Sequence, residues 1–317
     1  MRTWLTERLD LGVPVICAPM AGVAGGHLAG AVSAAGGLGM VGVGDRTPPE
    51  WIREQCSIAS QSGRPFGVGL QAWALPLNPG QEEAVLESRA SLVSVCYGPH
   101  EGHIAKFRNA GMLVATAVGN HQEACLATES DVDLIIARGA EGGGHGRNDV
   151  STLVLLQSVL EVAQIPVVAA GGIGNARGLA AVVAAGAAGA WVGTAFTATV
   201  ESMTGTVARE RLVGAQDTDT VYTHAFDIAA QARWPREFGE RALRNTFLNN
   251  WEGQEQYLET DFLVALQMAR ALAEGNYDTA CIDAGQGVGL VKNIQTAADV
   301  IQEFSRADDL LKRHTLS

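Results

Sequence analysis

Residues 166–194 read PVVAAGGIGNARGLAAVVAAGAAGAWVGT, and this stretch decides the fold. It starts with an apolar run of strand length at 166–170 and passes through a glycine turn into an alanine-rich helical pattern at 176–185. It ends in a second apolar run at 190–193. Runs that are apolar at every position are typical of parallel strands buried on both faces. The stretch therefore predicts one strand–helix–strand unit.

The same unit recurs along the first two thirds of the chain. Apolar runs of strand length lie at 13–18, 38–43, 66–71, 91–96, 112–117, 132–137, 166–170 and 190–193. Helical patterns between them include 27–35, 50–60, 122–128, 152–162 and 176–185. Eight units of strand and helix predict an α/β fold, the (β/α)8 TIM barrel, and a doubly wound parallel sheet is the alternative.

The texture of the sequence changes after Glu201. Between 207 and 283, aromatic, Arg and Glu residues follow helical spacing, and no clear strand is visible. We predict a barrel over residues 1–206, a small helical subdomain inserted at 207–283, and a C-terminal segment, 284–317, whose last helix (294–312) returns to the barrel.

Composition excludes several kinds of partner. The chain has 317 residues, and 47% hydrophobic with 18% charged residues suits a globular protein rather than a disordered one. A net charge of −12 with only three lysines excludes a basic surface for nucleic acid and a polybasic membrane patch.

Residues 178–200 are uncharged over a length that could span a membrane. Alanine and glycine dominate them, so we predict a buried helix–turn–strand and no membrane contact.

The cysteines and the N-terminus point to a cytoplasmic protein. Five cysteines lie far apart, without a CxxC pair. This pattern predicts free thiols in a reducing compartment rather than a disulfide framework or a zinc site. The first ten residues carry charges before any apolar run, which is the wrong order for a signal peptide.

Two glycine clusters follow the last two predicted strands. Gly171 and Gly172 come after the seventh run, and Gly193-Thr194 ends the eighth. In barrels, the loops after these strands commonly bind a phosphate through backbone N–H groups. The alternative is that these glycines only turn the chain. A GxGxxG match at 37–42 precedes a strand instead of following one, so it does not predict a dinucleotide fold.

A glycine-rich loop follows the sixth run and reads Arg138-Gly-Ala-Glu-Gly-Gly-Gly-His145-Gly-Arg147. It lies at the face of the predicted barrel where catalytic groups occur, so His145 is a candidate general base. The alternative is a polar surface loop. His100 and His103 lack HExxH spacing and a third ligand nearby, so no metal site is predicted.

Several motifs, in the right order along nearly the whole chain, resemble the nitronate monooxygenase family, formerly called 2-nitropropane dioxygenases. They are Pro14-Val-Ile-Cys-Ala-Pro-Met-Ala-Gly22, Ala140-Glu-Gly-Gly-Gly-His145-Gly, Val167-Val-Ala-Ala-Gly-Gly-Ile173, Gly193-Thr-Ala-Phe196, Arg241-Ala-Leu-Arg-Asn245 and Ala284-Gly-Gln-Gly-Val-Gly-Leu290. Flavin-dependent enoyl reductases and quinone reductases share the barrel and several of these motifs.

The resemblance implies FMN as cofactor and His145 as the base over its reactive face. The implied reaction is the oxidation of nitronates or nitroalkanes by O2 to a carbonyl compound and nitrite. Two alternatives are an FMN-dependent NAD(P)H reductase of enoyl thioesters or quinones, and a flavin- or phosphate-binding protein without turnover. The implied FMN-binding residues are Ala18, Pro19, Met20 and Gly22 and Gly143 and Gly144 at the ring, and Gly171, Gly172, Gly193 and Thr194 at the phosphate.

The chain departs from many relatives at two positions. Gly69 stands where they have asparagine, which removes a polar side chain near the flavin pyrimidine. Gln71 lies two residues on, on the same face of the strand, and could replace it. Arg138 stands where many relatives have glutamine, and we expect its guanidinium near the flavin or the incoming anion. The alternative for Arg138 is solvent or a pair with Glu141.

Overall fold

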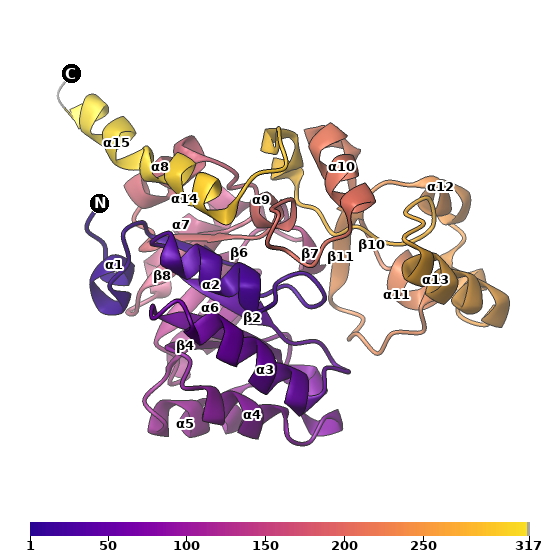
Figure 1. Cartoon of the computed structure of the whole chain (residues 1–317), viewed down its shortest axis with the longest axis horizontal. Coiled ribbons are helices and arrows are strands. Elements are labelled where there is room, and N and C mark those ends of the chain that lie inside the picture. Colours follow the sequence, from indigo (N-terminus) through magenta and orange to yellow (C-terminus); the bar gives the residue numbers. More distant parts are fainter. Residues whose placement is uncertain (316–317) are drawn as a thin grey trace.

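Within residues 1–315, which this computed structural model describes, eight parallel strands form one sheet (Figure 1). Its strands, in spatial order, are β1 (Val15–Cys17), β9 (Gly189–Val192), β8 (Val167–Ala170), β6 (Leu134–Arg138), β5 (Leu113–Val118), β4 (Leu92–Cys96), β3 (Phe66–Gln71) and β2 (Gly39–Gly42). A bridge between Ile16 and Leu38 joins the two edge strands. The sheet is a barrel, as predicted, and a doubly wound sheet is wrong.

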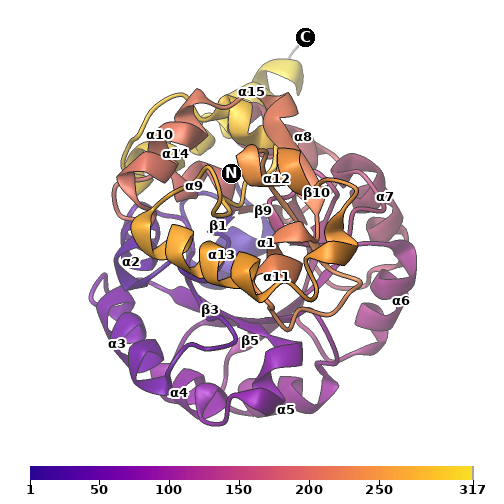
Figure 2. The ribbon, with the colours of Figure 1, turned by 90° about the vertical axis from the view of Figure 1, so that its right-hand side faces the viewer.

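Helices surround this barrel as a ring (Figure 2). They are α2 (Gly26–Ala34), α3 (Pro49–Ser60), α4 (Gln81–Ser88), α5 (Glu101–Asn109), α6 (His121–Glu129), α7 (Thr152–Val162) and α8 (Ala176–Ala184). One buried cluster fills the space between strands and helices. A second cluster fills the barrel interior, and α1 (Trp4–Leu9) adds Leu5 and Leu9 to it. Both faces of each strand are thus buried, which is why the runs are apolar throughout.

The uncharged stretch 178–200 forms most of α8, all of β9 and the short α9 (Thr194–Thr197). A glycine turn that includes Gly186, at φ +109°, separates α8 from β9. The predicted buried helix–turn–strand is what the structure contains. Within residues 1–315, no helix has both the length and the apolar character needed to cross a membrane.

The segment after the barrel strands forms a subdomain over the barrel mouth (Figures 1 and 2). Its helices are α10 (Thr206–Gly214), α11 (Ala225–Ala229), α12 (Thr246–Trp251) and α13 (Phe262–Glu274). It also contains β10 (Thr220–Thr223) and β11 (Gly239–Leu243), so the expectation of a region without strands was wrong. β11 pairs with β10 on one side and with β7 (Gly144–Gly146) of the glycine-rich loop on the other, in an antiparallel sheet, and a partner as distant in sequence as β7 leaves no local signal.

The C-terminal segment packs against the barrel as two helices, α14 (Ala297–Ser305) and α15 (Ala307–Thr315). The single helix predicted over 294–312 was wrong in two respects. Thr296 caps α14 by accepting a hydrogen bond from the backbone N–H of Asp299, so the helix starts later. Arg306 then separates the two helices. Short 3₁₀ turns complete the described chain: Ala72–Leu77, Asp217–Asp219, Glu255–Tyr257 and Gln286–Leu290.

Candidate active site

A cavity of about 590 Å³ lies at the carboxyl ends of the barrel strands, where β7 and the subdomain meet them. Every residue that the sequence analysis selected lines it. These are Ala18, Pro19, Met20, Gly22, Gly69, Gln71, Arg138, Gly143, Gly144, His145, Gly171, Gly172, Gly193 and Thr194. Residues from distant parts of the sequence therefore form one site, at the face where barrel enzymes place their active sites.

The turns after β8 and β9 form a cradle of backbone groups. Gly171 and Gly172 have φ values of +113° and +69°, a region that favours glycine. A Cβ atom on Gly171 would lie 2.6 Å from Thr152 Oγ1. In the described part of the chain, the backbone N–H groups of Gly193 and Thr194 meet no hydrogen-bond acceptor. Such N–H groups suit an anion.

Gly69 and Gln71 belong to β3 and line the part of the cavity opposite this cradle. They are two residues apart and therefore lie on the same face of the strand. A Cβ atom on Gly69 would lie 2.1 Å from Pro19 Cγ, so Pro19 fills the space that a larger side chain would need. Gln71 Oε1 is buried and accepts no hydrogen bond from any described residue. This oxygen can accept a hydrogen bond from a ligand, for example from the N3–H group of a flavin pyrimidine.

Arg138 braces the glycine-rich loop from inside. It is 8% exposed, and its guanidinium donates to the carbonyl oxygens of Gly142 (2.9 Å), Gly144 (2.8 Å) and Arg147 (3.0 Å). Burial lowers the pKa of this group. Arg138 lines the cavity, but both of its Nη groups donate to backbone carbonyl groups, and it forms no ion pair with Glu141. Glu141 instead accepts from the backbone N–H of Thr152.

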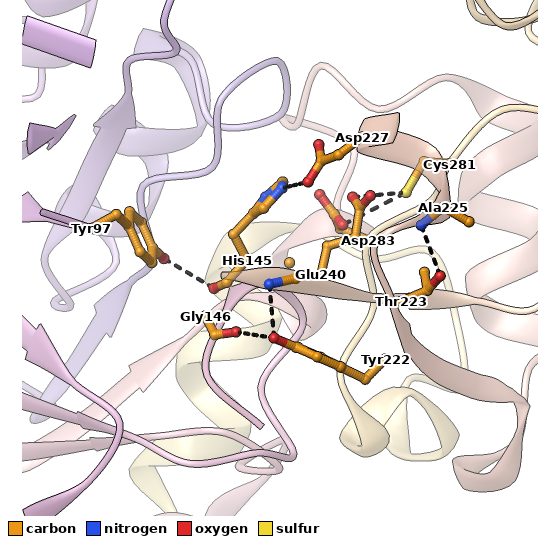
Figure 3. A network of polar contacts seen from close by, with 12 residues as sticks. Tyr97, His145, Gly146, Tyr222, Thr223, Ala225, Asp227, Glu240, Cys281 and Asp283 are labelled. Atoms are coloured by element: carbon orange, nitrogen blue, oxygen red, sulfur yellow. Dashed lines mark hydrogen bonds and ion pairs between the residues drawn. The ribbon is translucent and has the colours of Figure 1, made fainter. Parts of the chain in front are cut away.

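His145 is held by contacts from the subdomain and the barrel (Figure 3). Its Nε2 lies 2.8 Å from Asp227 Oδ2, and the ring of Trp234 stacks on the imidazole with centroids 3.6 Å apart. Tyr97 donates its hydroxyl to the carbonyl oxygen of His145 (3.2 Å), and burial raises the pKa of Tyr97 to about 12. The imidazole is thus fixed in orientation beside the cavity.

A second group of side chains lines the cavity next to His145. Glu240 lies opposite His145 in the β7–β11 pairing, and Cys281 and Asp283 come from the segment after α13. Burial raises the pKa of Glu240 well above its ordinary value, and the charges of Asp283 and Asp227 raise it further. Burial raises the pKa of Asp283, against the effect of the His145 charge. Burial, followed by the charge of Glu240, raises the pKa of the Cys281 thiol.

Sequence reasoning missed Asp227, Trp234 and this second group. Asp227 and Trp234 lie in a region without a recognisable motif. Glu240 precedes the motif at 241–245 and Asp283 precedes that at 284–290, so proximity to motifs was the only available signal. Their convergence depends on the pairing of β11 with β7 and on a bridge between Ala242 and Asp283.

The features of the cavity fit an FMN-type cofactor. The orphaned Gln71 oxygen suits the pyrimidine, and the Gly193–Thr194 N–H groups suit a phosphate. A (β/α)8 barrel with such a cavity and a fixed histidine beside it defines a flavin oxidoreductase. The family model for nitronate monooxygenase matches residues 2–82 and 77–306. The chain belongs to the nitronate monooxygenase family.

Relatives and solved structures extend this comparison. A Rhodococcus jostii protein named (3aS,4S,5R,7aS)-5-hydroxy-7a-methyl-1-oxo-octahydro-1H-indene-4-carboxyl-CoA dehydrogenase is 31% identical, over 99% of this chain and 97% of its own. A nitronate monooxygenase from Pseudomonas aeruginosa is 30% identical, over 92% of this chain and 95% of its own. Among structures, FabK from Thermotoga maritima aligns with a TM-score of 0.87 at 30% identity, covering 99% of both chains. A nitroalkane oxidase from Streptomyces ansochromogenes aligns with a TM-score of 0.84 at 28% identity, again covering 99% of both.

Proposed function

We propose that the protein is an FMN-dependent enzyme that oxidises nitronates and nitroalkanes with O2 to carbonyl compounds and nitrite. The observation that carries this proposal is the contact of 2.8 Å between His145 Nε2 and Asp227 Oδ2 at the edge of the cavity. Family membership and the nitronate monooxygenases among its relatives support it. The five cysteines are free, which suits the cytoplasm as its location.

Named residues would hold FMN. Gly171, Gly172, Gly193 and Thr194 would hold the phosphate, and Gln71 would accept from the pyrimidine. The flavin ring would lie against Ala18, Pro19, Met20, Gly22, Gly143 and Gly144, with Gly69 beneath Pro19 and Arg138 supporting the loop. When bound, FMN accepts electrons from the substrate and passes them to O2.

His145 would supply the proton chemistry. Donation from its Nε2–H to Asp227 leaves Nδ1 as the basic nitrogen. Nδ1 takes the α-proton of a neutral nitroalkane, and Asp227 stabilises the resulting imidazolium. A nitronate is already an anion, so the imidazolium would orient it by charge. The stacked Trp234 covers one face of the imidazole and limits the approach of water to that face.

The second candidate function is a flavin-dependent oxidation or reduction of a CoA thioester. The Rhodococcus jostii relative is named as a carboxyl-CoA dehydrogenase, and its similarity covers 99% of this chain. A second cavity, of about 880 Å³, lies in the subdomain and has Asp227, Trp234 and Phe238 in its wall. Trp234 lines both cavities. This second cavity offers room for the remote part of a large substrate.

Anaerobic reduction of the flavin separates the two candidates. The FMN-loaded enzyme is mixed without oxygen with propionate 3-nitronate, with a saturated acyl-CoA, or with NADH followed by an enoyl-CoA, and the visible flavin band is followed over time. We expect the nitronate to bleach the band fastest, and readmitted O2 to restore it with release of nitrite. Faster bleaching by the acyl-CoA or by NADH would move the assignment to the thioester reaction.

A further inference from the structure

Three side chains of metal-ligand type converge at one edge of the cavity, next to His145 (Figure 3). Cys281 Sγ lies 3.4 Å from Glu240 Oε2 and 3.7 Å from Asp283 Oδ1. All three residues line the cavity. The proposed reaction uses none of them.

The spacing of these atoms matches the edges of a tetrahedron around zinc. With Zn–S of about 2.3 Å and Zn–O of about 2.0 Å, tetrahedral angles place sulfur and oxygen ligands about 3.5 Å apart. The two observed separations, 3.4 and 3.7 Å, lie on either side of this value. The three side chains therefore need little movement to share one ion.

The cluster also contains an unused ligand atom. Glu240 is 4% exposed, and its Oε1 has no hydrogen-bond partner among the described residues. Among the side chains of residues 1–312, no Lys or Arg forms an ion pair with Glu240 or Asp283. A cation at this point would give the orphaned Oε1 of Glu240 a partner.

We propose that Glu240, Cys281 and Asp283 bind one thiophilic divalent cation, best matched by Zn²⁺, with a fourth position open to the cavity. Three protein ligands and one open position are a common zinc arrangement, and a thiolate favours Zn²⁺ over Mg²⁺ or Ca²⁺. On binding, the Oε–metal and Sγ–metal bonds replace the O–H bond of protonated Glu240 and the S–H bond of Cys281, and both protons leave to solvent. This site departs from the sequence-based expectation of no metal, and it does not rest on the proposed reaction.

Occupancy of this site should inhibit the enzyme. A ligand oxygen of Glu240 lies within 4.8 Å of the ligand atoms of His145 and Asp227. An ion held by these three ligands, with its fourth position in the cavity, would occupy space beside the imidazole that the substrate must enter. Zinc should therefore act as a reversible inhibitor, relieved by a chelator.

The test is a zinc titration of the FMN-loaded protein by calorimetry, with X-ray absorption of the zinc complex. We expect one zinc per chain and one sulfur ligand at about 2.3 Å. Cys281→Ser should weaken binding by at least about tenfold, because it removes the soft ligand. Glu240→Gln keeps the shape of the side chain and should also weaken binding, while the thermal midpoint of each variant reports folding.

Cys125→Ser is the matched control. Cys125 is also half-buried and lies 3.5 Å from His121 Nε2 on α6, so it is the competing thiol site. This variant should bind zinc as the unchanged protein does. The proposal is overturned by an absence of saturable binding, by a zinc complex without sulfur, or by binding that survives Cys281→Ser and disappears in Cys125→Ser.

Discussion

The two walls of the cavity are built in different ways. The barrel wall after β1, β8 and β9 consists mostly of backbone and small residues, represented by Gly172 and Gly193. The wall beside β7 and the subdomain consists of polar and aromatic side chains, represented by His145, Trp234 and Asp283. Under the proposed function, this difference predicts a division of labour, in which the barrel wall and the backbone of Gly143 and Gly144 hold the cofactor and the side chains of the second wall set the reactivity.

The largest expected effect lies in the barrel wall, at Gly193. A Cβ atom there would meet only Met20 Sδ at 3.5 Å and Ala18 Cβ at 3.8 Å, so the chain itself tolerates a side chain. In Gly193→Asp, a carboxylate about 4 Å from the FMN phosphate costs about 4 kcal/mol at an effective dielectric of about 20. This corresponds to a loss of FMN affinity of roughly 10³-fold. The variant should purify colourless but folded.

Absorbance of the purified protein and its thermal midpoint check this prediction. Gly102→Asp adds the same charge on α5, where a Cβ atom meets nothing within 4 Å, and it should stay yellow. A yellow Gly193→Asp protein with full FMN content would remove the phosphate from this part of the cavity.

The same contrast explains what could be predicted from the sequence. The run at 66–71 has the bounds of β3, because a strand buried on both faces is apolar throughout. The residues of the cradle could be selected because Gly171-Gly172 and Gly193-Thr194 are each contiguous and directly follow a strand. Local sequence is sufficient for both features.

The second wall depends on contacts between distant residues, and these leave no local pattern. Only the pairing of β11 with β7 places Glu240 opposite His145. Arg138 shows the same limit: its residue type predicted a charge near an anion, yet the folded loop presents it with several backbone carbonyl groups. Long-range pairing decides which partner a polar side chain finds.

The second prediction concerns His145. If it is the base, His145→Ala should lower the oxidation of a neutral nitroalkane by roughly 10²- to 10⁴-fold. A preformed nitronate needs no proton removal, so its oxidation should fall less, and FMN content should not change. Steady-state rates on both substrates measure the difference, with His27→Ala on the exposed part of α2 as control. Equal and small losses on both substrates would remove the role in proton abstraction.

Asp227 should act through His145, with a smaller effect. Asp227→Asn weakens the charge-assisted hydrogen bond to Nε2, which is worth about 1.5 to 3 kcal/mol, and the rate on a nitroalkane should fall roughly 10- to 100-fold. A nitronate needs no proton removal, so its kcat should fall less than that of the nitroalkane, and the weaker imidazolium should appear as a higher KM for the nitronate. Asp217→Asn alters an exposed carboxylate in the same subdomain and serves as control. A loss of FMN from Asp227→Asn, or equal losses on both substrates, would contradict the positioning role.

Trp234 should give the smallest effect and tests the division of labour most directly. Its ring stacks on His145 at an interplanar angle of 6° and lines both cavities. An aromatic contact of this kind is worth about 0.5 to 1.5 kcal/mol, so Trp234→Ala should lower kcat on a small nitroalkane roughly 2- to 10-fold. Trp234→Phe should retain part of the stacking and lose less. Trp251→Ala removes an aromatic ring from the same subdomain, at a position that lines neither cavity, and should leave kcat unchanged.

Because Trp234 lies in the second wall, FMN content should stay full in its variants. A fall in FMN content that matches the fall in kcat would show that the two walls are not separate, since a side chain of one would then be holding the cofactor of the other.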